Sequence, residues 1–208
     1  MSRTAEQAPP APDLRERRRL ATRQEIYDVA LGLFERQGVA ATTVDEIAQA
    51  AGVSPRTFFR YFASKEEAVL APARDLDEAL ALWVLEADAE ADLLPEIERA
   101  FVEVIVGPVA GTPDAIDHMV RIRRLVAAEP ALRAAALALD GEITARLASR
   151  VAEQVPSLDA VSARLVAEVA QATMRVAFDE WADRGGDVDL ADVYRQVRAA
   201  LRRVVVAR

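Results

Sequence analysis

TTVDEIAQAAGVSPRTFFRYFASKEEAVL, residues 42–70, is the stretch of this sequence that decides the fold. It holds two short segments with apolar residues at helical spacing, and each segment opens with a capping residue. Thr43 is followed three residues later by Glu46, which is the spacing of a capping box, and Ser54 opens the second segment. Gly52 lies between the segments, where a tight turn favours a residue without a side chain. Two short helices joined in this way predict a helix-turn-helix.

The second helix of this motif carries the side chains that a helix-turn-helix presents to DNA. Pro55 stands at its first helical position, where the missing backbone donor costs nothing. Arg56 and Thr57 follow in the exposed first turn, from which such a helix contacts base edges in the major groove. Because arginine can donate two hydrogen bonds to guanine, Arg56 is the leading candidate for base recognition, and Thr57 for a base-edge or phosphate contact.

Helices are also predicted on both sides of the motif. Upstream, Thr22 and Glu25 have capping-box spacing and open a helix that ends at Gly38 and can extend back through an arginine cluster. Downstream, Ser64 and Glu67 open another helix. The cluster is either an arm that contacts phosphate or a solvated helix end. The apolar face of the upstream helix consists of Ile26, Ala30, Leu33 and Phe34, and the cluster consists of Arg15, Arg17, Arg18, Arg19 and Arg23.

The remainder of the chain is predicted to be helical throughout. Apolar residues recur at helical spacing after residue 66, and no stretch alternates apolar with polar residues as a half-buried strand does. We therefore expect an all-α protein with a flexible Pro/Ala-rich tail over 1–13, an N-terminal three-helix helix-turn-helix DNA-binding domain over 14–66, and a larger α-helical domain over 67–208.

The charge distribution is compatible with DNA binding although the formal net charge is −8. Residues 1–70 balance ten basic against ten acidic side chains, so the acidity lies in the second domain. The chain has no cysteine, which excludes disulfides, thiolate zinc sites and cysteine nucleophiles. No apolar run is long enough to span a bilayer, and the first residues lack an apolar signal core. We therefore expect a cytoplasmic protein with no membrane partner.

Residues 42–70 resemble the N-terminal pattern of the TetR family of transcriptional regulators. The shared features are a Thr-x-x-x-Ile-Ala core, Gly-Val-Ser, an aromatic-rich recognition helix that ends in Tyr-Phe, and Ser-Lys-Glu. Beyond this stretch only the length and the helical character match. The resemblance implies a homodimer that binds double-stranded DNA at a palindromic operator, with residues 67–208 binding a small-molecule effector and forming the dimer.

Carried over position by position, the resemblance implies a set of DNA contacts. Thr43 would meet a phosphate at a helix N-terminus, where backbone amides favour anions. Tyr61 and Lys65 would bind the DNA backbone. Lys65 is the only lysine in the chain, and a GC-rich genome explains the use of arginine at all other basic positions equally well. The expected DNA-binding residues are Thr43, Ser54, Pro55, Arg56, Thr57, Tyr61 and Lys65.

Two positions depart from the pattern that many family members share. Arg56 stands where many have glycine, and Phe59 stands where many have a tyrosine whose hydroxyl reaches phosphate. Because Phe59 lacks that hydroxyl, the contact is in doubt and a core position is the alternative. Phe58 and Phe62 are expected in the core, since duplex readout leaves the bases stacked.

The resemblance also implies an effector pocket among the central helices of the second domain. Large, adaptable apolar side chains line such pockets, but more often they fill cores. The candidates for ligand binding are Trp83, Phe101, Met119, Met174, Phe178 and Trp181. A faint resemblance of the C-terminal region to sensors of acyl thioesters or other lipophilic metabolites implies a lipophilic effector. Arg121, Arg123 and Arg124 form either an anion-binding group or a solvated helix face, and the lone His118 is expected to be structural.

Two apolar stripes near the C-terminus agree with a homodimer, although both could instead serve an internal core. One stripe is Val161, Leu165, Val169, Ala172 and Val176, and the other is Val193, Val197, Ala200, Leu201 and Val204.

An enzyme is the function class that the sequence disfavours most. Catalysis needs a nucleophile, a base or a metal constellation, and the sequence has one histidine, no glycine-rich phosphate loop and no Asp/Glu/His cluster at metal spacing. We therefore expect no catalytic residue, no metal and no cofactor. Two regulatory functions stay open: a repressor released by its ligand, and a ligand-independent or activating DNA-binding regulator.

Overall fold

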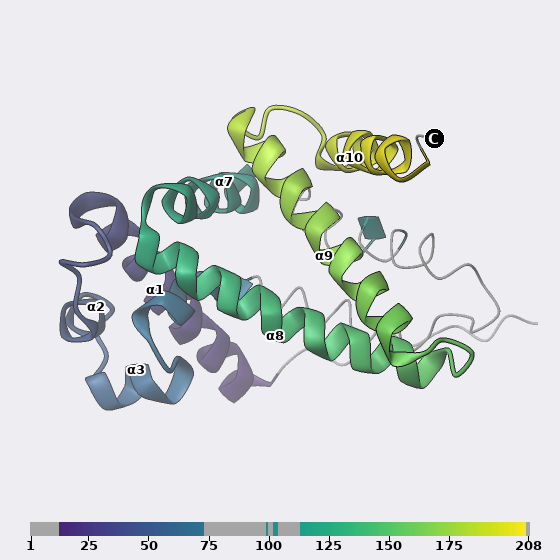
Figure 1. The fold of residues 1–208 in the computed structure, drawn as a ribbon. Helices are drawn as coiled ribbons and strands as arrows, with labels where there is room; N and C mark the ends of the chain where they lie inside the picture. The colour runs from purple at the N-terminus through teal and green to yellow at the C-terminus, as the bar shows by residue number, and fades with distance from the viewer. Residues whose placement is uncertain (1–12, 73–98, 100–101, 104–112, 207–208) are drawn as a thin grey trace, which may run out of the picture.

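A computed structural model of the protein describes residues 13–72, 99, 102–103 and 113–206 (Figure 1). These ranges consist of helices and their connecting turns, with no strand among them, and the predicted all-α fold is confirmed. The named helices are α1 Leu14–Gln37, α2 Val44–Ala50, α3 Pro55–Tyr61, α7 Pro113–Ala128, α8 Pro130–Gln154, α9 Ala160–Asp183 and α10 Leu190–Val206. A further helical segment covers residues 65–72.

Helix α1 begins earlier than its capping-box signal predicts. Asp13 caps it, because its Oδ1 accepts a hydrogen bond from the Glu16 backbone nitrogen at 2.7 Å. Thr22 lies inside the helix, where its hydroxyl donates to the Arg18 carbonyl at 2.9 Å. The predicted start at Thr22 is therefore wrong, and the extension through the arginines is correct, because a strong cap and good helix formers precede Thr22. The helix ends before Gly38 as predicted.

Helices α1, α2 and α3 share one apolar core. Ile26 of α1, Ile47 of α2 and Phe58 of α3 are completely buried in it. Burying one large apolar side chain from each helix fixes how the three helices pack, and α2 and α3, with seven residues each, are too short to be stable alone.

The same core continues into the second half of the chain. Val69 belongs to it, and so do Ile122 of α7 and Leu132 of α8. The domain boundary predicted at residue 66 falls inside the helical segment over 65–72. That segment follows the recognition helix and packs against α7 and α8, so it links the two halves; the division into domains itself stays a prediction.

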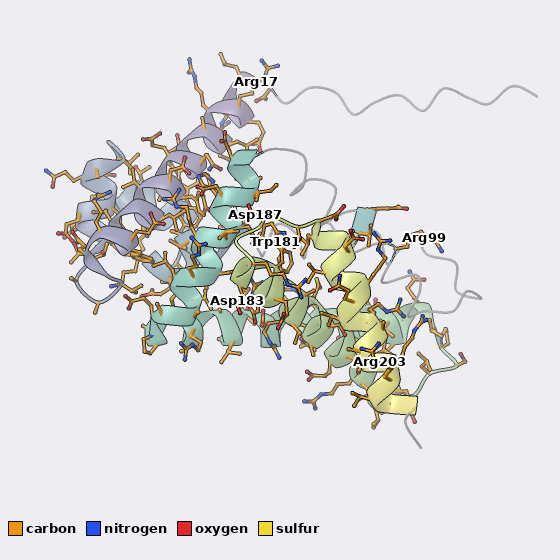
Figure 2. The ribbon with its side chains drawn as sticks, turned by 90° about the horizontal axis from the view of Figure 1, so that it is seen from above. Arg17, Arg99, Trp181, Asp183, Asp187 and Arg203 are labelled. Carbon is orange, nitrogen blue, oxygen red and sulfur yellow. The ribbon has the colours of Figure 1, made fainter. Side chains whose placement is uncertain are left out.

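Helices α8 and α9 pack against each other through the C-terminal part of α8 and the N-terminal part of α9, and α10 packs on α9 (Figure 1). Where α8 meets α9, the small side chains of Ala163 and Ala167 lie among Leu147 and Val151. Because alanine side chains are small, the backbones of α8 and α9 can approach each other closely along this face. Figure 2 shows Arg17 at the outer end of α1 and Arg203 on α10 at the opposite side of the fold.

The turn between α9 and α10 requires a glycine. Gly186 has a φ of 77°, and a Cβ at this position would lie 2.9 Å from Cγ2 of Val120 in α7. Any larger residue would combine backbone strain with a clash against α7.

Some sequence predictions fall on residues outside the described ranges. Trp83 and Phe101 are among them, as is the tail apart from Asp13. Within the described part of the chain, every helix is too short or too polar to cross a membrane.

Candidate DNA interface and effector cavity

Helix α3 begins with the predicted cap. Ser54 Oγ accepts a hydrogen bond from the Thr57 backbone nitrogen at 3.1 Å and lies 2.9 Å from the Thr57 hydroxyl. Pro55 is the first helical residue, and the chain reaches it through Gly52, whose φ of 66° is disfavoured for other residues. Arg56 is exposed, whereas Thr57 is half-buried and shares its hydroxyl with the cap. The first turn therefore directs one charged side chain, Arg56, outward.

Helix α2 begins with the predicted capping box. The Glu46 carboxylate accepts from the Thr43 backbone nitrogen at 2.8 Å and from the Thr43 hydroxyl at 2.9 Å. In return the Glu46 backbone nitrogen donates to the Thr43 hydroxyl at 3.2 Å. The hydrogen bond from the Thr43 backbone lowers the pKa of Glu46. Because the carboxylate already occupies this helix end, a phosphate here would be held by the remaining amides more than by the Thr43 hydroxyl.

The Lys65 ammonium makes two internal hydrogen bonds. It donates to the Val39 carbonyl at 2.6 Å and to the Thr42 carbonyl at 2.7 Å. These bonds tie the segment over 65–72 to the loop that precedes α2, next to Thr43. An ammonium has three N–H donors, so a DNA phosphate would use the third. Lys65 thus has a structural role in holding this loop, and its contact with a DNA phosphate stays a prediction.

Removing the Lys65 ammonium should destabilise the fold. In Lys65→Met the two carbonyls lose a charged donor, and we expect the free energy of unfolding in urea to fall by about 1–3 kcal/mol. Arg56→Met, a change of an exposed cation on α3, should leave the unfolding curve in place. If both variants unfold at the same urea concentration as the wild-type protein, the carbonyl contacts do not stabilise the fold.

The aromatic residues of α3 divide between core and surface. Phe58 and Phe62 are buried, which confirms their predicted core positions, while Phe59 is 57% exposed. The core alternative for Phe59 is therefore wrong, because neighbouring helical positions point about 100° apart and only one can face α1 and α2. Tyr61 is half-buried, with the Arg60 guanidinium 5.1 Å from its ring centre.

A basic groove of about 580 Å³ lies between the start of α1 and the end of α3. It is lined by Asp13, Arg15, Glu16, Arg18, Arg19, Thr22, Arg60 and Tyr61. Arg19 is paired with Glu16 across 2.7 Å. Arg60 was missed by the sequence analysis, although its place one turn after Arg56 puts both on the same helix face. The groove joins the arginine cluster to the recognition helix in one basic surface.

Helices α1 and α7 are joined by polar contacts. Arg121 donates to both oxygens of Glu35, at 2.6 and 2.7 Å, and these bonds lower the pKa of Glu35. His118 Nε2 lies 3.8 Å from an Asp28 oxygen, and its ring meets the edge of Tyr27 at 5.6 Å. Arg121 and His118 thus serve the contact between the two halves of the chain.

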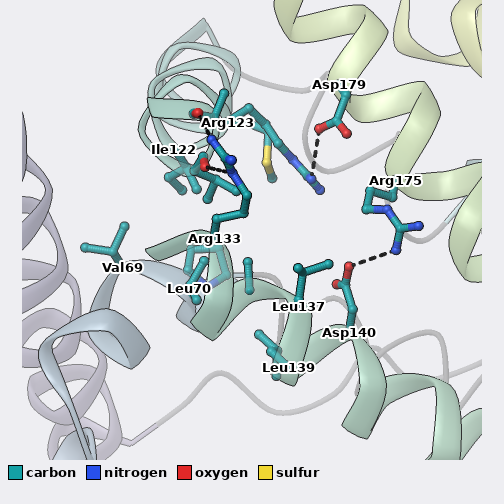
Figure 3. A pocket seen from close by; sticks show the side chains of 15 residues that line it. Val69, Leu70, Ile122, Arg123, Arg133, Leu137, Leu139, Asp140, Arg175 and Asp179 are labelled. Atoms are coloured by element: carbon teal, nitrogen blue, oxygen red, sulfur yellow. Dashed lines mark hydrogen bonds and ion pairs between the residues drawn. The ribbon is translucent and has the colours of Figure 1, made fainter. Parts of the chain in front are cut away.

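A cavity of about 250 Å³ lies where the segment over 65–72 meets α7, α8 and α9 (Figure 3). The segment contributes Val69, Leu70 and Pro72, and the other helices contribute Met119, Ile122, Arg123, Val126, Ala127, Arg133, Ala136, Leu137, Leu139, Asp140, Arg175 and Asp179. It is close to the lower end of the size range of small-molecule sites, about 300–1,000 Å³. The helical segment that follows α3 therefore forms one wall of the cavity.

The cavity has a charged side formed by two ion pairs between helices. Arg123 of α7 lies 3.3 Å from Asp179 of α9, and Asp140 of α8 lies 3.3 Å from Arg175 of α9. Arg133 closes a further edge by donating to the Val126 and Ala127 carbonyls at the end of α7. Figure 3 shows the ion pairs on one side and Val69 on the other.

Of the predicted ligand-binding residues, Met119 is the one described residue that lines this cavity. Met174, Phe178 and Trp181 pack together with it in a core cluster beside α10, and the Trp181 indole nitrogen donates to the Val188 carbonyl at 2.9 Å. The sequence analysis missed Asp140, Arg175 and Asp179 as residues that line the cavity. A possible signal was the i, i+4 spacing of Arg175 and Asp179, although Arg164 and Glu168 have the same spacing earlier in the helix.

A helix-turn-helix with an exposed, charged recognition helix, attached to a helical domain with its own cavity, defines the protein as a DNA-binding transcriptional regulator. Comparisons with known proteins agree. The family model described as bacterial regulatory proteins, tetR family, matches residues 26–71. The HTH-type transcriptional regulator TcmR of Streptomyces glaucescens is 38% identical over 187 residues, which cover 88% of this chain and 82% of TcmR. The chain belongs to the TetR family of regulators.

Two further comparisons differ in what they cover. The HTH-type transcriptional regulator AcrR of Shigella flexneri is 50% identical over 46 residues, 22% of this chain and 21% of AcrR. A crystal structure of a TetR-family regulator from Streptomyces coelicolor A3 covers 89% of this chain and 95% of its own, with a TM-score of 0.53 and 19% identity. The second comparison supports the fold alone. TcmR and AcrR are both transcriptional regulators, and this protein is a regulator, not an enzyme.

Proposed function

We propose that this regulator is a homodimeric repressor that binds a palindromic operator and is released from it by a small lipophilic ligand. One observation carries the proposal: the segment over 65–72 follows the recognition helix and also forms a wall of the cavity. A ligand in the cavity and DNA on α3 would therefore act on the same element. Since its target is operator DNA, we place the protein in the cytoplasm.

In this proposal the residues of the DNA interface have separate roles. Ser54 and Pro55 orient α3, and exposed Arg56 reads a guanine in the major groove, with Thr57 beside it. Exposed Phe59 is suited to contact a thymine methyl group instead of the phosphate that a tyrosine hydroxyl would reach. The phosphate contacts come from Tyr61 and Lys65 and from the helix end at Thr43.

The experiment that tests the DNA part separates base contacts from phosphate contacts. The fragments that the purified protein retains from a random DNA pool are sequenced, and affinity is measured across a salt series. Arg56→Ala should lose about 1–3 kcal/mol on the best operator and relax the preference at one symmetric pair of positions.

Arg60→Ala is the matched control, since Arg60 is an exposed arginine one turn later on the same helix. It should weaken all sequences alike and lower the slope of affinity against salt by about one unit. The assignment of roles is wrong if Arg56→Ala keeps the full sequence preference while Arg60→Ala changes it.

The homodimer is supported by an apolar stripe on α9 that its own fold leaves uncovered. Val161, Leu165 and Val176 are 76%, 62% and 45% exposed, while the opposite face of α9 is buried against α8 and α10. The second stripe differs along its length: Val193 is buried in the core beside Trp181, and Val204 is 78% exposed. Exposed apolar residues in a row are typical of a protein interface.

A two-fold dimer presents the same recognition helix twice, so the operator should be a palindrome. Half-sites read in successive major grooves lie about 34–36 Å apart, unless the DNA is distorted. For ligand release, the ligand must bind the DNA-free conformation more tightly, with a coupling free energy of about 1–3 kcal/mol. A promoter assay with and without the ligand distinguishes this repressor from a ligand-independent or activating regulator.

A further inference from the structure

One half of the cavity between residues 65–72 and helices α7, α8 and α9 is apolar. Val69, Leu70 and Ile122 form one side, and Leu137 faces them from α8 (Figure 3). Leu137 is 55% exposed, so its apolar side chain is open to solvent at the cavity. Of these residues Leu137 carries the accessible apolar surface, because Val69 is completely buried and Leu70 and Ile122 are 6% and 7% exposed. Covering Leu137 would stabilise a complex by about 25 cal/mol for each Å² removed from water, so the site favours an apolar body.

The charged side chains of the lining carry an excess of positive charge. Among the described residues that line the cavity, the charged ones are Arg123, Arg133, Arg175, Asp140 and Asp179, which leaves one positive charge unbalanced. An anionic ligand would neutralise the charge that Arg133 adds to the two ion pairs, whereas a cationic ligand would add to the excess.

Arg123 is the cation least exposed to solvent. Its side chain is 22% exposed, compared with 40% for Arg175, and the guanidinium lies 4.9 Å from the ring centre of Phe178. Burial lowers the pKa of Arg123, because the charged guanidinium is poorly hydrated and its neighbours do not fully replace the lost water. An anion bound in the cavity would therefore meet a cation that has lost much of its hydration.

The guanidinium of Arg123 also has unused bonding capacity. Among the described residues it donates one hydrogen bond, to Asp179 at 3.3 Å, although a guanidinium has five N–H donors. Charged hydrogen bonds are shorter, about 2.7–2.9 Å, when they are well formed. The Asp179 side chain is 56% exposed, so water screens this pair. A carboxylate from a ligand could form the short, paired bonds that Asp179 does not.

The neighbouring arginines of α7 do not offer the same site. Arg121 is held by both oxygens of Glu35, and Arg124 is exposed and does not line the cavity. Of the three arginines in this run, Arg123 alone faces the cavity.

We infer that the cavity binds an amphipathic anion: a compact apolar body against Leu137, with one carboxylate paired to Arg123. This inference rests on the proposed ligand-responsive function and names the chemical class of its ligand. It also assigns Arg123 as the residue that selects for the negative group.

Three probes with one apolar body and different charge test the inference. Binding of 2-naphthoate, 2-naphthalenemethanol and 2-naphthylmethylammonium to the full chain is measured by calorimetry. The carboxylate should bind about tenfold to hundredfold more tightly than the alcohol, and the ammonium should bind most weakly. Equal affinity for the three probes, or no binding of the carboxylate, would overturn the inference.

Matched variants locate the charge that makes the selection. Arg123→Gln should abolish the preference for the carboxylate and leave the affinity for the alcohol within about twofold, while Arg123→Lys should retain part of the preference because it keeps the charge. Arg124→Gln, an exposed neighbour on the same helix, should behave as wild-type protein. Full carboxylate preference in Arg123→Gln would overturn the role of Arg123. If a variant fails to fold, the comparison of the three probes on the wild-type protein still tests the inference.

Retention of DNA fragments by the same preparation, without any probe, tests the proposed function separately. If DNA is retained but naphthoate does not bind, the inference fails and the DNA-binding part of the proposal stands. If naphthoate binds through Arg123 but does not weaken DNA retention, the ligand class stands and release by ligand fails.

Discussion

Leu165→Asp is expected to convert the protein from a dimer into a monomer and to abolish tight operator binding. Leu165 is 62% exposed in the middle of the uncovered α9 stripe, between Val161 and Val176. In a two-fold interface each copy would place one unpaired carboxylate against an apolar surface. An uncompensated buried charge destabilises by about 3–5 kcal/mol, so the dissociation constant of the dimer should rise by about a thousandfold or more.

Sedimentation velocity at micromolar concentration, followed by operator titration, measures this effect. Val188→Asp is the matched control, because Val188 is an exposed valine in the turn after α9 and lies outside the stripe. It should sediment and bind DNA as wild-type protein does. A wild-type chain that sediments as a monomer and still binds its operator fully would contradict the proposed assembly.

Phe58→Ala is expected to cause the largest loss of stability of any single substitution in α3. Phe58 is completely buried in the core shared by α1, α2 and α3, and it contacts the ring of Phe62. Truncating a buried phenylalanine to alanine removes about 3–5 kcal/mol, which is a large part of the roughly 5–15 kcal/mol that stabilises a typical protein.

Phe59→Ala is the control that the structure offers at the next position. Phe59 is largely exposed, so its removal should change the free energy of unfolding by no more than about 0.5 kcal/mol. Urea unfolding of all three proteins, followed by circular dichroism at one protein concentration, separates the two positions. A larger loss in Phe59→Ala than in Phe58→Ala would mean that the two aromatic residues have exchanged roles.

The DNA-binding motif could be predicted from the sequence because its signals are local. The side chains of Thr43 and Ser54 each accept a hydrogen bond from the backbone nitrogen three residues later. Gly52 adopts a positive φ within the turn itself. Each of these interactions therefore lies within a few residues of sequence. The helical spacing of apolar residues is likewise independent of the rest of the fold, which is why the all-α class followed from it.

Local signals were insufficient where two of them compete or where a partner is distant. Thr22 has capping-box spacing, yet Asp13 caps α1 because the helix-forming run before Thr22 continues the helix. Lys65 bonds the carbonyls of Val39 and Thr42, more than twenty residues away, and no spacing in the sequence indicates this contact.

The position of the cavity was decided by tertiary structure. Met174, Phe178 and Trp181 have the size and spacing of pocket residues, yet the packing of α10 on α9 encloses them in a core. The cavity wall instead combines residues from the segment over 65–72 and three later helices. By itself the sequence determined the helices and the DNA-binding motif, since capping and periodicity act within a few turns. Only the packing of distant helices decided that Arg123 faces the cavity and Arg124 faces solvent, because that choice depends on where neighbouring helices lie.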